Sequence, residues 1–192
     1  MKKGIFISVE GLDGSGRFTV IHHLISKWFP DAVVTKQPLP EFEKFLVTQG
    51  ISAECMALSA ATSLQFAVDT VINPALADGG VVISNRFCDW MYAYQGYGQG
   101  FDIDWLDDLA PSIFPDLTIF LDCDPKTTLS WLRYKEGPDR VEKEGLEFYT
   151  RVRKGFLDLA EYYCERIVTI NVERQLEEVL EDVDKAVEEV LK

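Results

Sequence analysis

A glycine-rich segment near the start of the chain has the residue types and the spacing that bind phosphate. It extends from Glu10 to Thr19, and Gly11 and Gly16 have the spacing of the glycines in the phosphate-loop pattern G-x-x-x-x-G-K-[ST]. Glycines allow the backbone to curl so that successive N–H groups face one anion, and a following helix adds its positive end. We therefore predict a phosphate site that consists of Gly11, Leu12, Asp13, Gly14, Ser15, Gly16, Arg17, Phe18 and Thr19.

Two positions of this loop differ from the pattern. Arg17 replaces the usual lysine, and Phe18 replaces the usual serine or threonine. Arginine retains the charge, but its planar guanidinium is not equivalent to a compact ammonium, and phenylalanine has no hydroxyl for Mg²⁺. Thr19 supplies a hydroxyl if the register of the loop allows it. The alternative is a structural glycine-rich turn. The flanking strand and helix favour phosphate binding, whereas the efficiency of phosphoryl transfer stays open.

The elements that must hold this loop follow from the hydrophobic pattern. Short β-rich runs alternate with longer helical stretches, as is typical of parallel strands joined by right-handed helical crossovers. Ligands of such sheets bind at the carboxyl ends of the strands. The predicted strands are 5–9, 32–35, 81–84, 117–121 and 167–171, and the predicted helices are 17–28, 40–48, 53–77, 88–94, 104–112, 125–134, 145–164 and 176–191.

We therefore predict a single α/β domain over residues 1–192. Its fold class is a P-loop three-layer αβα fold with a five-stranded parallel sheet. The charged, loop-like stretch from Lys135 to Arg140 lies between two predicted helices, so we expect a short mobile lid at about residues 133–144.

Composition and charge exclude several other classes of protein. The net charge of −13 argues against sequence-independent binding to nucleic acid, which needs a basic surface. No uninterrupted apolar run reaches the roughly 18–20 residues that span a bilayer, and the N-terminal apolar run is too short for a signal peptide. We expect a cytoplasmic protein that binds no membrane. The cysteines are widely spaced, so we predict four buried reduced thiols and neither a disulfide framework nor a metal site.

The order of short motifs along the chain resembles that of the thymidylate kinase family nearly from end to end. The loop resembles the family's E-G-x-D-G-x-G-K, and the stretch from Ala93 to Gly98 is nearly unchanged. Any one motif is weak, but in this order they are specific. The further matches are Thr35-Lys36-Gln37-Pro38 for the family's T-R-E-P, Leu64 to Thr70 for its L-L-F-A-A-D-R, Ile72 to Leu76 for its I-x-P-A-L, Asn85-Arg86-Phe87 for its D-R-Y, Pro115 to Thr118 for its P-D-L-T, and Asp139 to Glu142 and Phe148 to Arg153 for its lid and the helix after it.

The resemblance implies a function. Members of the family transfer the γ-phosphoryl group of ATP to dTMP with Mg²⁺, giving dTDP, and they are commonly homodimers. The helix at 53–77 would supply the dimer face. The resemblance leaves the metal ligands unassigned. It implies that Arg17, Arg86 and Arg140 are catalytic, that the loop residues Gly11 to Thr19 and Arg133 bind ATP, and that Asp13, Phe66, Thr70, Arg86, Trp90, Tyr94 and Gln95 bind the acceptor.

The departures from the family pattern cluster at residues that carry chemistry. Charges are lost while the scaffold motifs survive. The replaced residues are the Arg at Thr70, the Arg-Glu at Lys36-Gln37, the Asp at Asn85, the two small polar residues at Trp90 and Met91, and the Arg of G-R-G at Gln99.

These departures leave several functions open. The chain is a kinase for dTMP, a kinase for another nucleoside monophosphate whose base pocket has been reshaped, or a nucleotide-binding protein with a degenerate active site that has lost most of its catalysis. A deoxynucleoside kinase or a small GTPase would share the opening loop. However, the chain has no N-K-x-D guanine signature, and the segment from Ala93 to Gly98 favours a thymidylate-type acceptor site.

Overall fold

A computed structural model of the chain describes residues 4–47, 50–132 and 145–192. Its centre is a sheet of five strands in the order β2-β3-β1-β4-β5, and every neighbouring pair is parallel. The predicted fold class is thereby confirmed. The strands are β1 Ile5–Gly11, β2 Val33–Lys36, β3 Val81–Asn85, β4 Leu117–Asp122 and β5 Ile167–Asn171.

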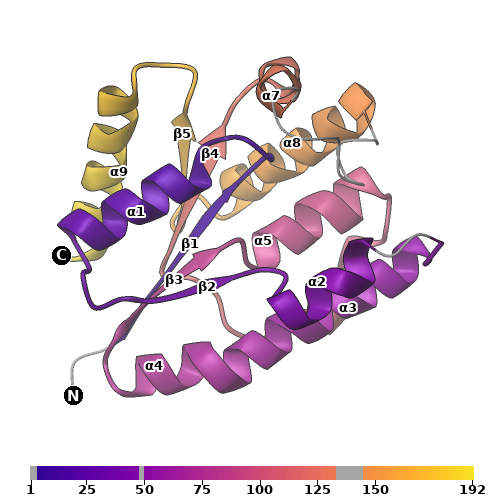
Figure 1. The fold of residues 1–192 in the computed structure, drawn as a ribbon, viewed down its shortest axis with the longest axis horizontal. Coiled ribbons are helices and arrows are strands. Elements are labelled where there is room, and N and C mark those ends of the chain that lie inside the picture. Colours follow the sequence, from indigo (N-terminus) through magenta and orange to yellow (C-terminus); the bar gives the residue numbers. More distant parts are fainter. Residues whose placement is uncertain (1–3, 48–49, 133–144) are drawn as a thin grey trace.

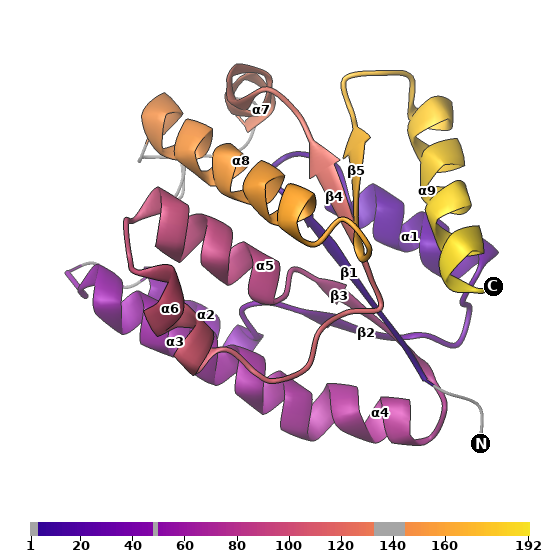
Figure 2. The same ribbon diagram turned by 180° about the vertical axis from the view of Figure 1, so that it is seen from behind.

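Helices cover both faces of the sheet (Figures 1 and 2). Their bounds agree with the predicted ranges to within a few residues, but the predicted helix 53–77 is divided by a π-helical segment and the predicted helix 88–94 continues into one that ends at Gly98. The helices are α1 Arg17–Lys27, α2 Pro40–Val47, α3 Ala53–Ala67, η1 Val68–Ile72, α4 Asn73–Ala77, α5 Cys88–Met91, η2 Tyr92–Gly98, α6 Ile103–Leu109, α7 Pro125–Leu132, α8 Gly145–Tyr162 and α9 Leu176–Val190.

Alternation along the strands divides the core between the two faces. Successive side chains of a strand point to opposite sides of the sheet. Ile7 and Val9 of β1 therefore pack with α1 and α9, whereas Phe6 packs with α3, α5 and α8. Because both faces are covered, the central strands β1, β3 and β4 are nearly continuous apolar runs. This explains why their positions could be predicted well.

The helical stretch Ala53–Ala77 is long and apolar enough to cross a membrane by length and composition alone. However, half of its most apolar 18-residue part is buried inside the protein. Its residues Ala57, Ala60 and Leu64 have no exposed surface and belong to the core. The stretch is therefore a core helix. Polar residues interrupt it, so it does not form an uninterrupted apolar run in the sequence.

The wide turn η1 follows from a proline. Pro74 has no backbone N–H, so it cannot donate to the carbonyl of Thr70 in an α-helical pattern, and its ring crowds that carbonyl. Val68 to Ile72 accordingly adopt a π-helical turn. Such turns are frequent at functional sites, and here η1 contains Thr70 while η2 contains Tyr94 and Gln95.

The prediction for the cysteines is wrong in part. Cys88 and Cys123 are buried, but Cys55 and Cys164 are exposed, and all are free thiols. Cys55 lies in the first turn of α3 and Cys164 just beyond α8, where helix ends meet solvent. Within the described ranges no group of three or more His, Cys, Asp or Glu residues could hold a metal ion. The proposed lid, with Arg133 and Arg140, lies outside the described residues.

The helices η2 and α8 pack so closely that Gly98 has no room for a side chain. A Cβ atom there would lie 2.6 Å from Cε2 of Phe148 and 2.9 Å from Cγ2 of Val152. We expect Gly98→Ala to lower the free energy of unfolding by about 1–3 kcal/mol, the usual effect of overpacking a core, as measured by urea denaturation. Phe148→Leu in the same chain should recover part of the loss. An unchanged stability in Gly98→Ala would contradict this account of the packing.

Candidate active site

The glycine-rich loop joins β1 to α1 at the carboxyl edge of the sheet. Gly11, Gly14 and Gly16 all have positive φ, at 143°, 88° and 93°, which residues with a Cβ rarely adopt. At Gly11 the space is also closed, because a Cβ would lie 2.6 Å from Oγ of Ser15 and 2.7 Å from the carbonyl oxygen of Leu121. The loop conformation therefore requires glycine for two independent reasons.

Arg17 folds back under this loop. Its Nη1 donates to the carbonyl oxygens of Gly11 at 2.6 Å and Leu12 at 2.8 Å. Its Nε donates to Oδ1 of Asn85 at 2.8 Å, and its Nη2 to Oδ1 of Asp13 at 3.2 Å. Burial, and next to it the charge of Arg86, lowers the pKa of Arg17, but an arginine stays protonated in proteins. The replacement for the usual lysine thus still places a positive charge at the loop.

Asp13 connects the loop to the end of β3. Its Oδ1 also accepts a hydrogen bond from Nη2 of Arg86, and its Oδ2 accepts one from the hydroxyl of Tyr94 at 3.3 Å. Burial would raise the pKa of Asp13, but the charges of Arg86 and Arg17 outweigh it and hold that pKa below its ordinary value. The carboxylate is therefore ionised at neutral pH and bridges two guanidinium groups.

Arg86 has an unusual backbone, with φ of 72° in the left-handed region. A non-glycine residue there is strained by on the order of 1–3 kcal/mol, and such strain concentrates at functional sites. The backbone N–H of Arg86 donates to the carbonyl of Val9 at 3.0 Å, and the carbonyl oxygen of Arg86 accepts a hydrogen bond from the hydroxyl of Ser84. These bonds hold the conformation that aims the side chain at the loop.

The guanidinium of Arg86 lies against two aromatic rings. Its Cζ is 5.4 Å from the ring centre of Trp90 and 5.0 Å from that of Tyr94. Burial by itself lowers the pKa of Arg86, but the charge of Asp13 outweighs burial and leaves that pKa above its ordinary value. Nε of Arg86 is buried and has no hydrogen-bond partner within the described ranges, so the cation keeps a donor for an anionic ligand.

The predicted acceptor residues divide into two groups. Trp90, Tyr94 and Gln95 are buried beside or near Arg86, and Nε1 of Trp90 and Oε1 of Gln95 have no partner in the part of the chain that the structure describes. Phe66 and Thr70 lie instead on the exposed side of α3 and η1. The ring of Phe66 is 47% exposed and 5.9 Å from that of Phe42, between centres.

The residues at two of the replaced positions have no free hydrogen-bond donor to offer a base. The hydroxyl of Thr70 donates to the carbonyl of Phe66 at 2.7 Å within the helix. Met91 has no exposed surface at all. Recognition of a base at these positions therefore cannot reproduce what an arginine or a small polar residue would supply.

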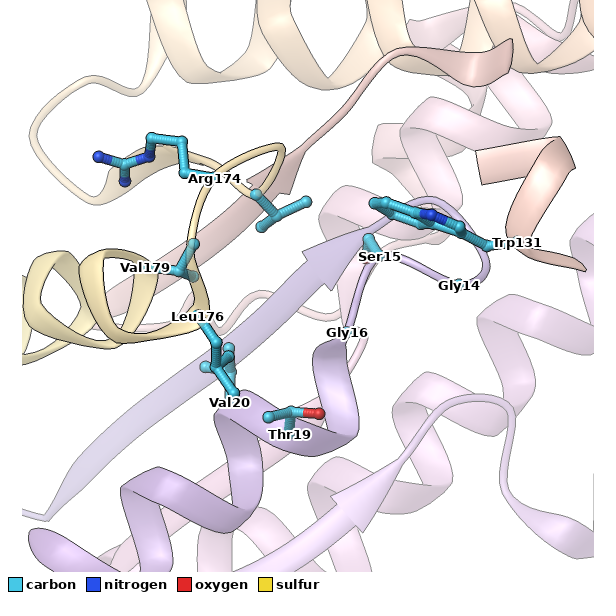
Figure 3. A pocket seen from close by; sticks show the side chains of 10 residues that line it. Gly14, Ser15, Gly16, Thr19, Val20, Trp131, Arg174, Leu176 and Val179 are labelled. Carbon is cyan, nitrogen blue, oxygen red and sulfur yellow. The ribbon is translucent and has the colours of Figure 1, made fainter. Parts of the chain in front are cut away.

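A cavity of about 300 Å³ opens on the other side of the loop (Figure 3). Gly14, Ser15, Gly16 and Thr19 form one wall, so the predicted phosphate loop faces a space that can hold a ligand. The exposed ring of Phe18 is not among the lining residues, and Leu12 is buried. The other walls come from Val20, Trp131, Val172, Arg174, Leu176 and Val179.

Sequence reasoning missed Trp131 and Arg174 as site residues. Both could have been found from position, because Trp131 lies in the helix after β4 and Arg174 just after β5, where ligands of parallel sheets bind. Arg174 is held by Asp182 at 2.5 Å and by the carbonyl of Asn171 at 3.1 Å. Trp131 is 40% exposed, so its ring is available as a flat apolar surface.

Glu10, the residue before Gly11, is fully buried, and the charges of Arg86 and Arg17 offset only part of the cost of its burial. Its Oε1 accepts from the backbone N–H of Phe87 at 2.6 Å, but Oε2 has no partner within the described ranges. Burial, and next to it the charge of Asp89, raises the pKa of Glu10 to about 8. The carboxyl is therefore mostly neutral at pH 7. Its hydrogen bond to Phe87 holds the backbone directly after Arg86.

This raised pKa predicts a specific dependence of stability on pH. Because the folded protein holds the Glu10 proton up to pH of about 8 and the unfolded chain releases it near 4.5, folding stability from this group falls as pH rises between those values. In Glu10→Gln that loss is absent. Its free energy of unfolding relative to the wild type should rise from pH 5 to pH 8, by at most about 1.4 kcal/mol per pH unit.

Urea denaturation at pH 5, 6.5 and 8 measures this difference. Glu54→Gln, at an exposed position in the first turn of α3, is the matched control and should show no such trend. Parallel pH curves for Glu10→Gln and the wild type would contradict the assignment of a neutral buried carboxyl.

Comparison with known proteins shows what the whole chain is similar to. The family model described as Thymidylate kinase matches residues 9–183. The chain is 33% identical over 207 residues to the thymidylate kinase of Lactobacillus helveticus (strain DPC 4571), covering 98% of this chain and 98% of that protein. It is 34% identical over 202 residues to that of Symbiobacterium thermophilum (strain DSM 24528 / JCM 14929 / IAM 14863 / T), covering 97% and 94%.

The three-dimensional comparison agrees with these matches. The crystal structure of thymidylate kinase from Ehrlichia chaffeensis superposes with a TM-score of 0.76 at 31% identity, covering 97% of this chain and 99% of that one. The family model, the sequence relatives and the solved structure all span the phosphate loop, the Arg86 turn and the sheet between them. From its loop, its fold and these full-length matches, the chain belongs to the thymidylate kinase family.

Proposed function

We propose that this member of the family transfers the γ-phosphoryl group of ATP to dTMP and gives dTDP. The observation that carries the proposal is the bridge of Asp13 between Arg17 and Arg86, because it joins the donor phosphate loop to the cation that faces the acceptor side. Residues 1–192 act as one kinase domain, with a lid at about 133–144 that closes over the phosphates.

The donor occupies the loop and the cavity beside it. The triphosphate lies along the backbone N–H groups of the loop at the start of α1, whose positive end attracts anions. Those of Ser15 and Thr19 already donate within the protein, so Gly14, Gly16, Arg17 and Phe18 supply the N–H groups. The base then reaches the cavity wall and stacks on Trp131, since an exposed indole offers a large flat surface. Arg133 follows in sequence and completes the donor site from the lid.

The chemical step needs charge neutralisation more than covalent help. Arg17 lies below the loop and Arg86 opposite it, so the transferred group passes between two positive charges. Arg140 adds a third from the lid. Each such group stabilises the charge that develops on the transferred phosphoryl group, because the site is already organised around that charge before the reaction.

The acceptor binds on the Arg86 side of Asp13. Nε of Arg86 is the free donor for the monophosphate, and Asp13 and Tyr94 flank the sugar. The base lies toward Phe66 and Thr70, with Trp90 and Gln95 behind it as the buried side chains that still have an unpaired polar atom. The base pocket is therefore more apolar than an arginine at position 70 would make it.

Magnesium enters with ATP as part of the substrate. Mg²⁺ is commonly held by one or two carboxylates together with substrate phosphates. Asp13 is engaged by two arginines and Oδ1 of Asn85 by Arg17, so neither is a free ligand. The phosphate oxygens therefore supply most of its ligands, and the hydroxyl of Thr19, which faces the cavity, is the nearest protein ligand to them.

A second copy of the chain covers the outer side of α3. Leu58 lies on this side and is 44% exposed, and the resemblance to a family of homodimers supports this face as the interface. The homodimer is a cytoplasmic enzyme whose partners are nucleotides. Size-exclusion chromatography with light scattering distinguishes a dimer from a monomer.

The active site departs from the family pattern, but the residues around the phosphate loop are connected by hydrogen bonds. Arg17 and Asn85, which stand where the family has lysine and aspartate, form a hydrogen bond with each other. Arg17 also bonds to the loop and to Asp13, and Asp13 bonds to Arg86, so these groups form one connected set. This arrangement supports a working kinase over a degenerate nucleotide-binding protein.

A coupled assay of ADP release with ATP, Mg²⁺ and each nucleoside monophosphate in turn tests the function. We expect turnover that is selective for dTMP. In Arg86→Lys the kcat/KM for dTMP should fall by on the order of 10²–10³-fold, the usual loss of a charge-stabilising group, with an unchanged circular dichroism spectrum. Selectivity for another monophosphate would reassign the acceptor, and binding of ATP without any turnover would overturn the proposal in favour of a degenerate site.

The role of Trp131 in donor binding has its own test. Stacking of a base on an aromatic side chain contributes about 1–3 kcal/mol by alanine substitution, so Trp131→Ala should raise the KM for ATP about tenfold and leave the KM for dTMP and kcat nearly unchanged. Trp131→Phe should retain most of the affinity. Tyr162→Ala, an exposed aromatic residue outside the cavity, is the control. An unchanged KM for ATP in Trp131→Ala would remove this residue from the donor site.

A further inference from the structure

Arg17 uses nearly all of its hydrogen-bonding capacity inside the protein. A guanidinium has five N–H groups, and four of them donate to Asn85 Oδ1, Gly11 O, Leu12 O and Asp13 Oδ1. A lysine at this position has three donors on one atom, so it cannot reach the loop carbonyls and Asn85 together. The loop conformation and the position of Asn85 thus depend on the planar fork of an arginine.

Asn85 is fixed from both sides. It is the last residue of β3 and lies in register with Val9 of β1 and Lys36 of β2. Its carbonyl accepts the N–H of Gln37 at 2.9 Å, and the residue is only 6% exposed. The sheet holds the backbone of Asn85 in place, so only a rotation of its side chain could move the amide away from Arg17. Such a rotation would break the hydrogen bond from Nε of Arg17.

The hydrogen bond from Arg17 also determines which way the Asn85 amide points. The amide oxygen must face Nε–H, since only the oxygen can accept. Nδ2 therefore points away from Arg17 and has no hydrogen-bond partner within residues 4–47, 50–132 and 145–192. An aspartate here would present an acceptor in place of this donor, and a phosphate oxygen needs a donor.

Charge gives a second reason for a neutral residue at position 85. Asp13 carries the negative charge of the cluster, while Arg17 and Arg86 carry two positive charges. Glu10 adds no charge at neutral pH because its pKa is raised to about 8. The cluster therefore has an excess of one positive charge for anionic phosphates, which an aspartate at position 85 would cancel.

We propose that Arg17 and Asn85 act as one unit that positions the phosphate loop, with Asn85 Nδ2 as an additional donor to the ATP phosphates. The two departures from the lysine and aspartate of the family pattern are then a single matched exchange and not two separate losses. Asn85 thus has two parts in the proposal: its Oδ1 positions Arg17, and its Nδ2 contacts the donor phosphates. This inference rests on the proposed function for its kinetic readout, but binding of ATP can be measured without any acceptor.

A double-mutant cycle tests the pair, with Arg17→Lys, Asn85→Asp and the double variant. We expect each single variant to weaken binding of the β,γ-imido analogue of ATP, measured by calorimetry, and to lower kcat/KM for ATP by about tenfold to a hundredfold. In the double variant the ammonium faces a carboxylate, so the loss should be at least about tenfold smaller than the product of the single losses, within the range of coupling seen for residues in contact.

The outcomes separate the pair from the function. Losses that multiply without coupling, or single variants that bind the analogue as tightly as the wild type, would overturn the pairing. If the wild type binds the analogue but turns over no monophosphate, the proposed function fails, and the calorimetric cycle still decides on the pair.

A matched control excludes a general effect on folding. Arg166→Lys changes an arginine that makes a bidentate ion pair with Asp89, and Arg166 lies just before β5, at the opposite edge of the sheet from the loop. It should lower the thermal midpoint and leave the affinity for the analogue unchanged. The KM for dTMP should also stay unchanged in Arg17→Lys, because the pair acts on the donor; an equal increase in both KM values would indicate misfolding and contradict the proposal.

Discussion

The carboxylate of Asp13 is the interaction on which the rest of the active site depends. It lies between the guanidinium groups of Arg17 and Arg86, which would repel each other without a negative charge between them. Two like charges in a partly buried site are unfavourable, since a low local dielectric strengthens their repulsion. Asp13 therefore allows the protein to bring two cations to one place, and their excess positive charge is what a phosphate needs.

The surrounding fold exists to hold these groups where they are. The parallel sheet brings the ends of β1 and β3 side by side, and Glu10 binds the backbone of Phe87 across that edge. Between these fixed points Arg86 adopts its left-handed conformation. The strain at Arg86 persists because hydrogen bonds on both sides determine it, as expected for a residue whose side chain must point in one direction.

The departures from the family pattern have different physical meanings once the contacts are known. Arg17 and Asn85 form a hydrogen bond with each other, so two of the departures are in direct contact. Thr70 donates its hydroxyl to the carbonyl of Phe66, and Met91 is fully buried. These two positions therefore offer a base no free hydrogen-bond donor, unlike the family residues they replace. Residues that look equally degenerate in the sequence thus lie in different surroundings: Arg17 and Asn85 are at the glycine-rich loop, whereas Thr70 is bonded within its own helix.

Much of the fold and part of the site could be predicted from the sequence. The strands were found because parallel strands covered on both faces are apolar throughout, and the phosphate loop because Gly11 and Gly16 have the spacing that an anion requires. Arg86 was predicted as a site residue because it directly follows a buried strand, and the structure places it beside Asp13 of the loop. These features are local, so residue order alone contains them.

Other features depend on residues that are distant in the sequence. Arg17 meets Asn85 across 68 positions and Arg86 meets Asp13 across 73, and nothing in either segment specifies the partner. Trp131 and Arg174 became site residues only because the ends of β4 and β5 meet the loop at one edge of the sheet. The sequence by itself determined the elements and the charges available, whereas the tertiary structure decided which charges are paired and which atoms remain free for a ligand, because pairing depends on distances between strand ends that only the assembled sheet sets.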